Sequence, residues 1–308
     1  MKIINLSAEP TGKIRSWIPI GLDAEKVVFL PDACPGKSPL PTGTAVLTYQ
    51  TNWRQFAVSD CGCGMRLLRS SLLASDFASA PWDKVAEALR KNKGSLGDLG
   101  GGNHFLDALQ AYNNDHLHFL IHTGSRSESG IVDAYVDDPD KFDYVYDQVT
   151  GWAVANRLYV QHALEQEFGK LGVILDLPHN TYELQPDGGV LIYKGAVAVK
   201  PGDLNIIPSH MAGDVSLVRA TPNVSEILCS LSHGTGRAMS RAECKPLGDL
   251  YDFERLRERV LIPEVVQDAS LRTEGPFAYR DLDACLSLLG GYVEEVERYS
   301  VIGYMGHL

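Results

Sequence analysis

The sequence predicts an α+β fold, built as a single domain over residues 1–308 with mixed β-sheets and helices around a site carried on loops. Short apolar runs bounded by Gly and Pro indicate buried strands, and longer stretches with apolar residues at helical spacing indicate helices. These two kinds of segment do not alternate as regular strand–helix–strand units, which favours α+β over α/β. A chain of 308 residues with 44% hydrophobic and 22% charged residues can bury a substantial core.

The first three elements lie in the middle of the chain. Residues 117–121 form a short apolar run typical of a buried strand, and His122 falls where it ends. Residues 152–168 have helical spacing, and the glycine that follows them suits a C-cap. Residues 173–175 form a second apolar run, with His179 just beyond it. We expect two strands that end at histidines to bring both side chains to a common rim.

The later elements are indicated by turn sequences and by helical spacing. A Pro-Asp-Gly turn precedes the apolar residues 190–193, which predicts half of a hairpin. A Pro-Gly-Asp turn precedes a strand over residues 204–207. The end of the chain predicts helices over residues 253–261 and 283–297, although a Gly-Gly pair interrupts the second.

Composition and charge restrict the class of protein. The formal net charge of −11 argues against a protein that coats nucleic acid nonspecifically, although it allows a local basic site. Residues 1–17 lack the apolar run of an export signal, and no window reaches the roughly 18 apolar residues of a membrane span. We therefore expect a cytoplasmic protein with no membrane partner, whose six cysteines are reduced thiols.

Six short polar segments carry residues that bind metals or act as nucleophiles. They cover residues 31–36, 60–65, 100–105, 122–126, 178–180 and 232–237. Together they supply a carboxylate, thiols and imidazoles, which suit a transition-metal site better than a magnesium site built from oxygen ligands. The set predicts a metalloenzyme.

Five residues in these segments form a candidate ligand set. Asp60 and Cys63 lie three residues apart in a glycine-containing loop, where the thiolate could bridge two ions and the carboxylate could bind one of them. His104 follows three glycines, which let a loop wrap closely around a cation, and His122 and His179 complete the set. Each residue alone is explained as well by an ordinary core or loop position. The ligand types leave zinc, manganese, iron and cobalt open.

A further histidine, His233, lies in the segment Ser-His-Gly-Thr-Gly-Arg. Its two glycines would let backbone N–H groups approach a phosphate, and Arg237 could bind phosphate oxygens as a fork. Neither a Walker pattern nor a dinucleotide fingerprint occurs in the sequence. The histidine is a candidate general base or phosphoryl-accepting nucleophile, and the alternative is a glycine-rich turn packed under a strand.

In these motifs the chain closely resembles one family, the RtcB RNA-splicing ligases. The resemblance runs from about Pro31 to Arg241 and rests on Asp-x-Gly-Cys-Gly-Met, Gly-Gly-Gly-Asn-His-Phe, His-x-Gly-Ser-Arg and His-Gly-x-Gly-Arg-x-Met-Ser-Arg. It implies two Mn²⁺ ions held by one Asp, one bridging Cys and three His, which fall here on Asp60, Cys63, His104, His122 and His179. It also implies that His233 attacks GTP and becomes guanylylated.

The reaction that this resemblance implies joins two RNA ends. GMP passes from His233 to an RNA 3′-phosphate, and a 5′-hydroxyl then attacks the activated end and displaces GMP. A 2′,3′-cyclic phosphate would first be hydrolysed in the same site. The implied contacts to nucleotide or phosphate are Asn103, Asp107, Arg126, His210, Gly234, Gly236 and Arg237. The implied partners are RNA with broken ends and, in one subgroup, a release-factor-like or activator protein.

The chain departs from the family pattern at four places, and the last two of them belong to the guanine pocket that the resemblance implies. Cys34 stands where the family has histidine, and Asp107 stands where it has glutamate. Residues 208–212 read Pro-Ser-His-Met-Ala where the family has Pro-Gly-Ser-Met-Gly, and residues 303–308 lack its C-terminal Lys-Gly. The metal ligands and the nucleophile, in contrast, match the pattern.

Three rival functions remain open at this point. A metal-dependent phosphodiesterase acting on RNA cyclic-phosphate ends without nucleotide would keep the metal ligands but would not need His233. A non-catalytic RNA-end binder would account for the altered pocket but not for the complete ligand set. A ligase that uses ATP or another nucleotide donor would account for the changes at His210 and at the C-terminus.

Overall fold

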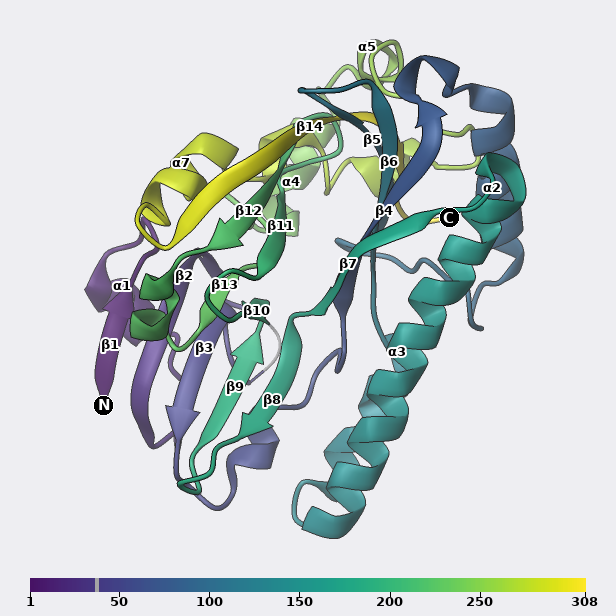
Figure 1. Ribbon diagram of the computed structural model, residues 1–308. Helices are drawn as coiled ribbons and strands as arrows, with labels where there is room; N and C mark the ends of the chain where they lie inside the picture. The colour runs from purple at the N-terminus through teal and green to yellow at the C-terminus, as the bar shows by residue number, and fades with distance from the viewer. Residues whose placement is uncertain (37–38) are drawn as a thin grey trace.

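Two β-sheets and one long helix make up most of the fold (Figure 1). The computed structural model of the chain describes residues 1–36 and 39–308. The five-stranded sheet has the order β1-β2-β3-β9-β8 and is mixed, because β1 pairs parallel with β2 while the other pairs are antiparallel. Its strands are β1 (Lys2–Asn5), β2 (Ala24–Cys34), β3 (Thr42–Thr48), β9 (Val190–Lys194) and β8 (Asn180–Leu184).

The second sheet has seven antiparallel strands in the order β11-β12-β14-β5-β6-β4-β7. Its strands are β11 (Leu204–Pro208), β12 (Asp214–Ala220), β14 (Val293–Met305), β5 (Phe105–Ala111), β6 (His116–Thr123), β4 (Gly64–Leu73) and β7 (Gly172–Pro178). A short antiparallel pair, β10 (Ala196–Ala198) and β13 (Ser230–Ser232), leads into the segment that carries the second candidate motif.

The helix α3 (Pro139–Phe168) packs against both large sheets. Asp138 caps its N-terminus with a side-chain hydrogen bond, and Gly169, at a φ of 74°, ends it. Near its start Phe142 belongs to the core of the five-stranded sheet, and near its end Leu164 belongs to a core under the seven-stranded sheet. One rigid helix therefore fixes the two sheets relative to each other.

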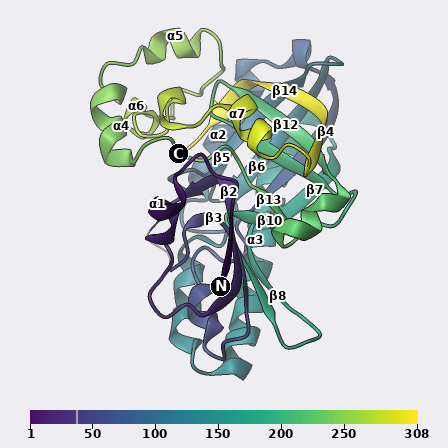
Figure 2. The same ribbon diagram turned by 90° about the vertical axis from the view of Figure 1, so that its left-hand side faces the viewer.

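The remaining helices are shorter than α3, and α4, α5 and α6 form a lobe to one side (Figure 2). They are α1 (Thr11–Arg15), α2 (Ser79–Lys91), α4 (Arg241–Gly248), α5 (Phe253–Arg257), α6 (Asp268–Leu271) and α7 (Leu282–Leu288). The 3₁₀ turns are η1 (Trp53–Phe56), η2 (Ala74–Asp76), η3 (Arg126–Tyr135), η4 (Pro222–Ile227) and η5 (Pro276–Ala278). Within the described residues, no helix has both the length and the apolar character to span a bilayer.

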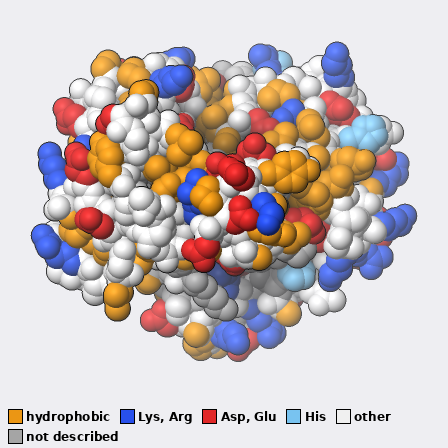
Figure 3. All heavy atoms as spheres, turned by 90° about the horizontal axis from the view of Figure 1, so that it is seen from below, with side chains coloured by type: hydrophobic (Ala, Val, Ile, Leu, Met, Phe, Trp, Pro, Cys, Tyr) orange, Lys and Arg blue, Asp and Glu red, His pale blue; other side chains and the backbone are white. Residues whose placement is uncertain are grey.

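Charged side chains of both signs are distributed over the surface. In the view from below (Figure 3), acidic side chains lie in the middle of the face and along its left side, and Lys and Arg lie mostly toward its margins. This face is therefore not an even basic coat, as the net charge of −11 leads one to expect.

The structure confirms the α+β class and most of the expected elements. The strands expected at residues 117–121, 173–175, 190–193 and 204–207 lie within β6, β7, β9 and β11, and the helix expected at 152–168 lies within α3. The hairpin is formed by β8 and β9. The helix expected at 253–261 is shorter, because α5 ends at Arg257 and Leu261 donates its backbone N–H to the carbonyl of Ile302 at the sheet edge.

The helix expected over residues 283–297 is wrong in its second half. The helix α7 ends at Leu288, and Gly291 takes a φ of 88°, which turns the chain back. The following residues form β14, a strand paired on both sides by β12 and β5. Glutamates favour helix on propensity alone, but two flanking partners for the backbone outweigh that preference here.

Candidate functional site

Three of the candidate ligands are brought together by the register of the seven-stranded sheet. Cys63 immediately precedes β4, whose Met65 lies opposite His122 in β6. On its other side β4 pairs with β7, and Gly64 lies opposite Pro178, so that His179 follows at the same end. The expected common rim is confirmed, because the central strand places the thiol between the two imidazoles.

The other two ligands reach the same point from loops. His104 precedes β5, in which Phe105 lies opposite His122. His104 Nε2 lies 3.2 Å from Asp60 Oδ2 and 3.3 Å from Cys63 Sγ. The structure therefore gathers all five ligands that the sequence suggests.

These five residues form two groups that share one thiol. One group is Cys63, His122 and His179, and the other is Asp60, Cys63 and His104; in each, the ligand atoms lie within 4.8 Å of one another. His122 Nε2 lies 3.5 Å from Cys63 Sγ and 3.3 Å from His179 Nε2. A mixed set of sulfur, nitrogen and carboxylate donors converging in this way fits transition-metal ions, with Cys63 positioned to bridge two of them.

Hydrogen bonds on the outer nitrogens orient the imidazoles. His122 Nδ1 donates to the Asn103 carbonyl at 2.9 Å, which leaves its Nε2 lone pair directed at the cluster. His104 Nδ1 accepts from Arg126 at 3.1 Å, because a guanidinium can only donate. The neutral His104 ring then carries its proton on Nε2 facing Asp60, and a metal ion would take the place of that proton.

The backbone around the ligands is tied to α3 by two buried side chains. Arg157 donates to the carbonyls of Gly62 and Thr123 at 3.0 and 3.2 Å and pairs with Asp176 at 2.7 Å. Asn156 donates to the carbonyls of Asp98 and Gly124, among other partners. The helix that joins the two sheets thus also supports the ligand loops.

Burial and charge shift the titration of the cluster. Burial raises the pKa of Cys63 well above its usual range, and the charge of Asp60 raises it further. Burial lowers the pKa of both His122 and His179, and neighbouring imidazoles add to the effect. Burial is the largest single influence on Asp60 and would raise its pKa, but interactions with His104, Lys194 and Cys63 together outweigh burial, and the pKa of Asp60 is lowered. A bound cation would favour the thiolate together with neutral imidazoles.

His233 lies directly beside this cluster. It follows β13, and its ring centroid is 4.5 Å from that of His179 and 6.1 Å from that of His122. Its Nδ1 is 2.6 Å from Oδ2 of Asp32, a fully buried carboxylate at the end of β2. With Nδ1 held by a carboxylate, the other ring nitrogen, Nε2, is the one available for chemistry.

A cavity of about 720 Å³ opens over the cluster and His233. Of the residues expected to contact nucleotide or phosphate, its lining includes Asn103, Asp107, His210, Gly234, Gly236 and Arg237. Arg126 is not part of this lining; it lies against His104, and its side chain is 26% exposed. Burial raises the pKa of Asp107 well above its usual range and lowers that of His210. Asp107 Oδ1 is buried with no hydrogen-bond partner among the described residues, so the cavity offers a polar group to a ligand.

Two arginines at this cavity are in different states. Arg237 is bound on every nitrogen, to Glu274, Thr273 and two other neighbours. Arg241 uses its Nε for Glu274, and its side chain is 49% exposed. The free end of Arg241 lies near Gly102, in the glycine run before His104. Arg237 therefore anchors the loop, whereas Arg241 has donors left for a phosphate.

Sequence reasoning did not assign a role to Asp32 or Glu274, two further residues of the candidate site. Asp32 lies inside one of the six polar segments, between Pro31 and Cys34, so the segment was found but the role of its carboxylate was not. Glu274 begins the Glu-Gly-Pro-Phe-Ala-Tyr segment and receives hydrogen bonds from Arg237, Arg241 and Tyr279. Nothing local in either stretch indicates which histidine or arginine it would meet.

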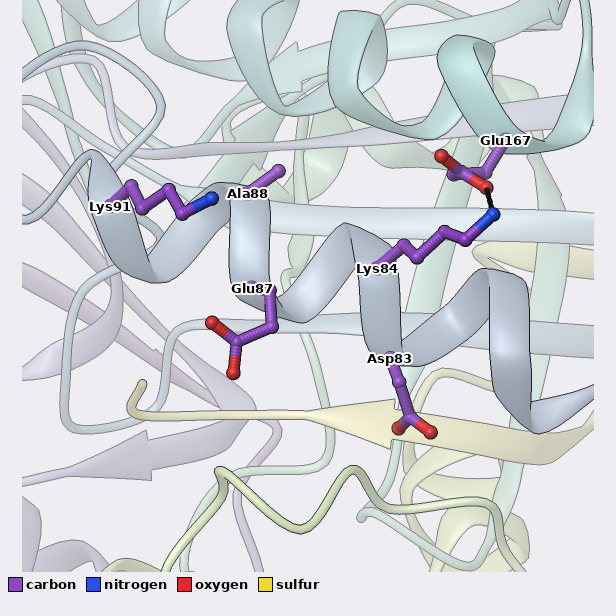
Figure 4. Close-up of a pocket in the computed structure, with 6 residues that line it drawn as sticks. All are labelled: Asp83, Lys84, Glu87, Ala88, Lys91 and Glu167. Atoms are coloured by element: carbon purple, nitrogen blue, oxygen red, sulfur yellow. Dashed lines mark ion pairs between the residues drawn. The ribbon is translucent and has the colours of Figure 1, made fainter.

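A shallow depression of about 370 Å³ lies elsewhere, along α2 and the end of α3 (Figure 4). Its lining consists of Asp83, Lys84, Glu87, Ala88, Lys91 and Glu167. Lys84 pairs with Glu167 at 3.2 Å, Glu87 pairs with Arg90 at 2.9 Å, and Asp83 and Lys91 are exposed. These groups form a solvated helix face rather than a reactive site.

Comparison with known proteins gives consistent results. A family model described as tRNA-splicing ligase RtcB matches residues 131–305. An RNA-splicing ligase RtcB2 from Escherichia coli is 30% identical, over 86% of this chain and 84% of its own length. The RNA-splicing ligase RtcB of strain K12 is 24% identical over 88% and 87%, and the tRNA-splicing ligase RtcB of Nanoarchaeum equitans is 26% identical over 77% and 64%.

Proposed function

This chain belongs to the RtcB family of tRNA-splicing ligases, and from that premise we propose that it is a manganese- and GTP-dependent RNA ligase. It joins an RNA 3′-phosphate or 2′,3′-cyclic phosphate to a 5′-hydroxyl through a guanylylated histidine. The observation that carries this proposal is the position of His233, which is oriented by Asp32 and lies against a thiol-sharing pair of metal-ligand groups.

The residues of the site divide into metal ligands and a nucleophile. Asp60, Cys63, His104, His122 and His179 would hold two manganese ions. When bound, these ions supply positive charge that neutralises phosphate oxygens and orients a phosphorus for in-line attack. Asp32 keeps the proton of His233 on Nδ1, so that Nε2 presents its lone pair to the cavity.

The chemistry then follows in balanced steps. His233 Nε2 forms a bond to the α-phosphorus of GTP, and pyrophosphate leaves. An oxygen of the RNA 3′-phosphate attacks the same phosphorus, and the bond to Nε2 breaks, which returns the histidine to its starting state. The 5′-hydroxyl of the second RNA attacks the activated 3′ end, loses its proton, and displaces GMP. Cyclic ends are opened by water before the second step.

Phosphate binding falls to groups with unused donors. Arg241 has a half-exposed guanidinium at the cavity. Gly234 and Gly236 line the same cavity, whereas Thr235 between them donates its backbone N–H to the carbonyl of Pro208 at 3.1 Å. Arg237, which the sequence suggested as a phosphate contact, supports this segment through Glu274. The proposed substrate is RNA with broken ends, and an activator protein of the release-factor-like kind is a proposed partner.

The experiment that tests this function is covalent labelling. Purified protein is incubated with manganese and GTP or ATP labelled at the α-phosphate and is then run under denaturing conditions. We expect a label with GTP that is absent in His233→Ala and present in the control His162→Ala, whose histidine is exposed on α3. A label with ATP alone would mean that ATP is the nucleotide donor. Manganese-loaded protein that takes up no label from either nucleotide would favour a phosphodiesterase.

A further inference from the structure

The turn that presents Asp60 to the metal cluster has an unusual backbone. Ser59 and Asp60 are consecutive and have φ values of 105° and 49°. Both φ values lie in the left-handed region, which residues other than glycine adopt only at a cost in free energy. Contacts with the surrounding residues must therefore hold Ser59 and Asp60 in this conformation. From this turn the Asp60 side chain reaches His104, with Oδ2 3.2 Å from Nε2.

Two donors from the five-stranded sheet hold the two carbonyls of this turn. Lys194 Nζ donates to the Ser59 carbonyl at 3.0 Å and lies 3.4 Å from its Oγ. Asn180 Nδ2 donates to the Asp60 carbonyl at 3.1 Å. Asn180 and Lys194 lie directly opposite each other in the β8–β9 pairing, so they act from one fixed point.

Asn180 is itself held on both sides. Its Oδ1 accepts from the Gly195 backbone at 2.8 Å, and its carbonyl accepts from the Gly62 backbone at 2.9 Å. Lys194 ends β9, and its partly buried side chain lines the cavity beside Ser59 and Asp60. The sheet thus reaches under the ligand loop through a matched pair of side chains.

We propose that Lys194 is a positioning residue of the metal centre, which holds the Ser59–Asp60 turn in its left-handed conformation and so aims the Asp60 carboxylate at the ion shared with His104 and Cys63. This inference rests on the proposed metal centre. It assigns Lys194 to the ligand group that contains Asp60. The other group, Cys63, His122 and His179, is oriented by β4, β6 and β7.

The test measures manganese binding by equilibrium dialysis with metal analysis, independent of ligation. In Lys194→Met we expect the affinity for one ion to fall about tenfold or more while the other ion binds within about threefold of wild type. The control Lys200→Met, at an exposed lysine, should bind both ions normally. Lys194→Arg retains a donor and should keep most of the affinity. In the presence of a chelator, all variants should have the same thermal unfolding midpoint. If Lys194 had a purely structural role, Lys194→Met would instead lower that midpoint.

A second-site change makes the test specific. Glycine adopts a φ of 105° without a side-chain penalty, so Ser59→Gly should restore the lost affinity in the Lys194→Met background. If Lys194→Met bound both ions with wild-type affinity, the role of Lys194 would be overturned, but the proposed metal centre would not. Equal loss of both ions without rescue by Ser59→Gly would also overturn it, in favour of a general disturbance of the site, because removing a positive charge would by itself strengthen cation binding. A wild-type protein that binds no manganese would overturn the proposed metal centre and the inference with it.

Discussion

Asp32 and His233 meet at 2.6 Å although 201 residues separate them in the chain. The carboxylate is fully buried, and Gly43 and Gly236 both pack against Asp32 so closely that neither position has room for a side chain. The pair fixes one ring nitrogen of His233 and leaves the other for the cavity, which is the arrangement a nucleophilic histidine needs.

Asp32→Asn should lower the rate of covalent nucleotide attachment by about a hundredfold or more, because an amide can hold the ring in the wrong tautomer. Manganese content should stay normal, since Asp32 contacts none of the five ligands in the structure. The check is the initial rate of labelling with α-labelled GTP at saturating manganese. Asp133→Asn, at an exposed aspartate, is the matched control, and an unchanged rate in Asp32→Asn would remove its proposed role.

Gly124→Ala should weaken manganese binding by about tenfold or more. A Cβ at this position would lie 2.6 Å from Asp60 Oδ1 and 2.8 Å from Cys63 Cβ, so both ligand groups must shift. Gly151→Ala is the control, because a Cβ there meets nothing within 4 Å and favours the helix. Metal analysis after dialysis distinguishes them, and two tightly bound ions in Gly124→Ala would contradict the proposed geometry.

Arg241→Gln and Arg237→Gln should fail in different ways. Removing the half-exposed Arg241 should raise the GTP or RNA concentration needed for half-maximal rate, with less than about 1 kcal/mol lost from the free energy of unfolding. Removing Arg237 leaves a buried Glu274 short of a partner and should cost roughly 3 kcal/mol. Urea unfolding and steady-state kinetics on both variants test the difference, which disappears if the two arginines share one role.

His118 should make the folded state less stable in mild acid. Burial lowers its pKa from 6.5 to about 4. Above pH 6.5 the ring is neutral in both states; below it the unfolded chain takes up a proton that the folded chain does not, so stability falls until about pH 4. The shift corresponds to roughly 3 kcal/mol. Urea unfolding of wild type and His118→Phe across this range should show a smaller loss in the variant, and parallel curves would refute the assignment.

Local pattern was sufficient for much of the fold and for finding the five residues that converge at the candidate metal centre. The strands at 117–121 and 173–175 were predictable because short apolar runs at turns have few other solutions. The strand β14 was not, because its glutamates favour helix and only pairing with β12 and β5 overrides them. Sequence pattern carries no information on such distant pairing.

The site shows the same division. The five ligands and His233 lie in motifs that identify themselves by residue type and spacing. The roles of Asp32 and Lys194 depend on contacts between distant segments, and the difference between Arg237 and Arg241 depends on Glu274. These roles could be assigned only from the structure, because each depends on which distant residue the side chain contacts and not on the local motif.

The order of the motifs along the chain has a consequence for biosynthesis. All five metal ligands have been translated once His179 is made, whereas the reactive histidine comes 54 residues later and Glu274, which anchors the loop after it, comes later still. A ribosome-bound chain would therefore possess all five proposed metal ligands before it possesses the proposed nucleophile, His233. Completion of the catalytic centre is a late event in the maturation of this protein.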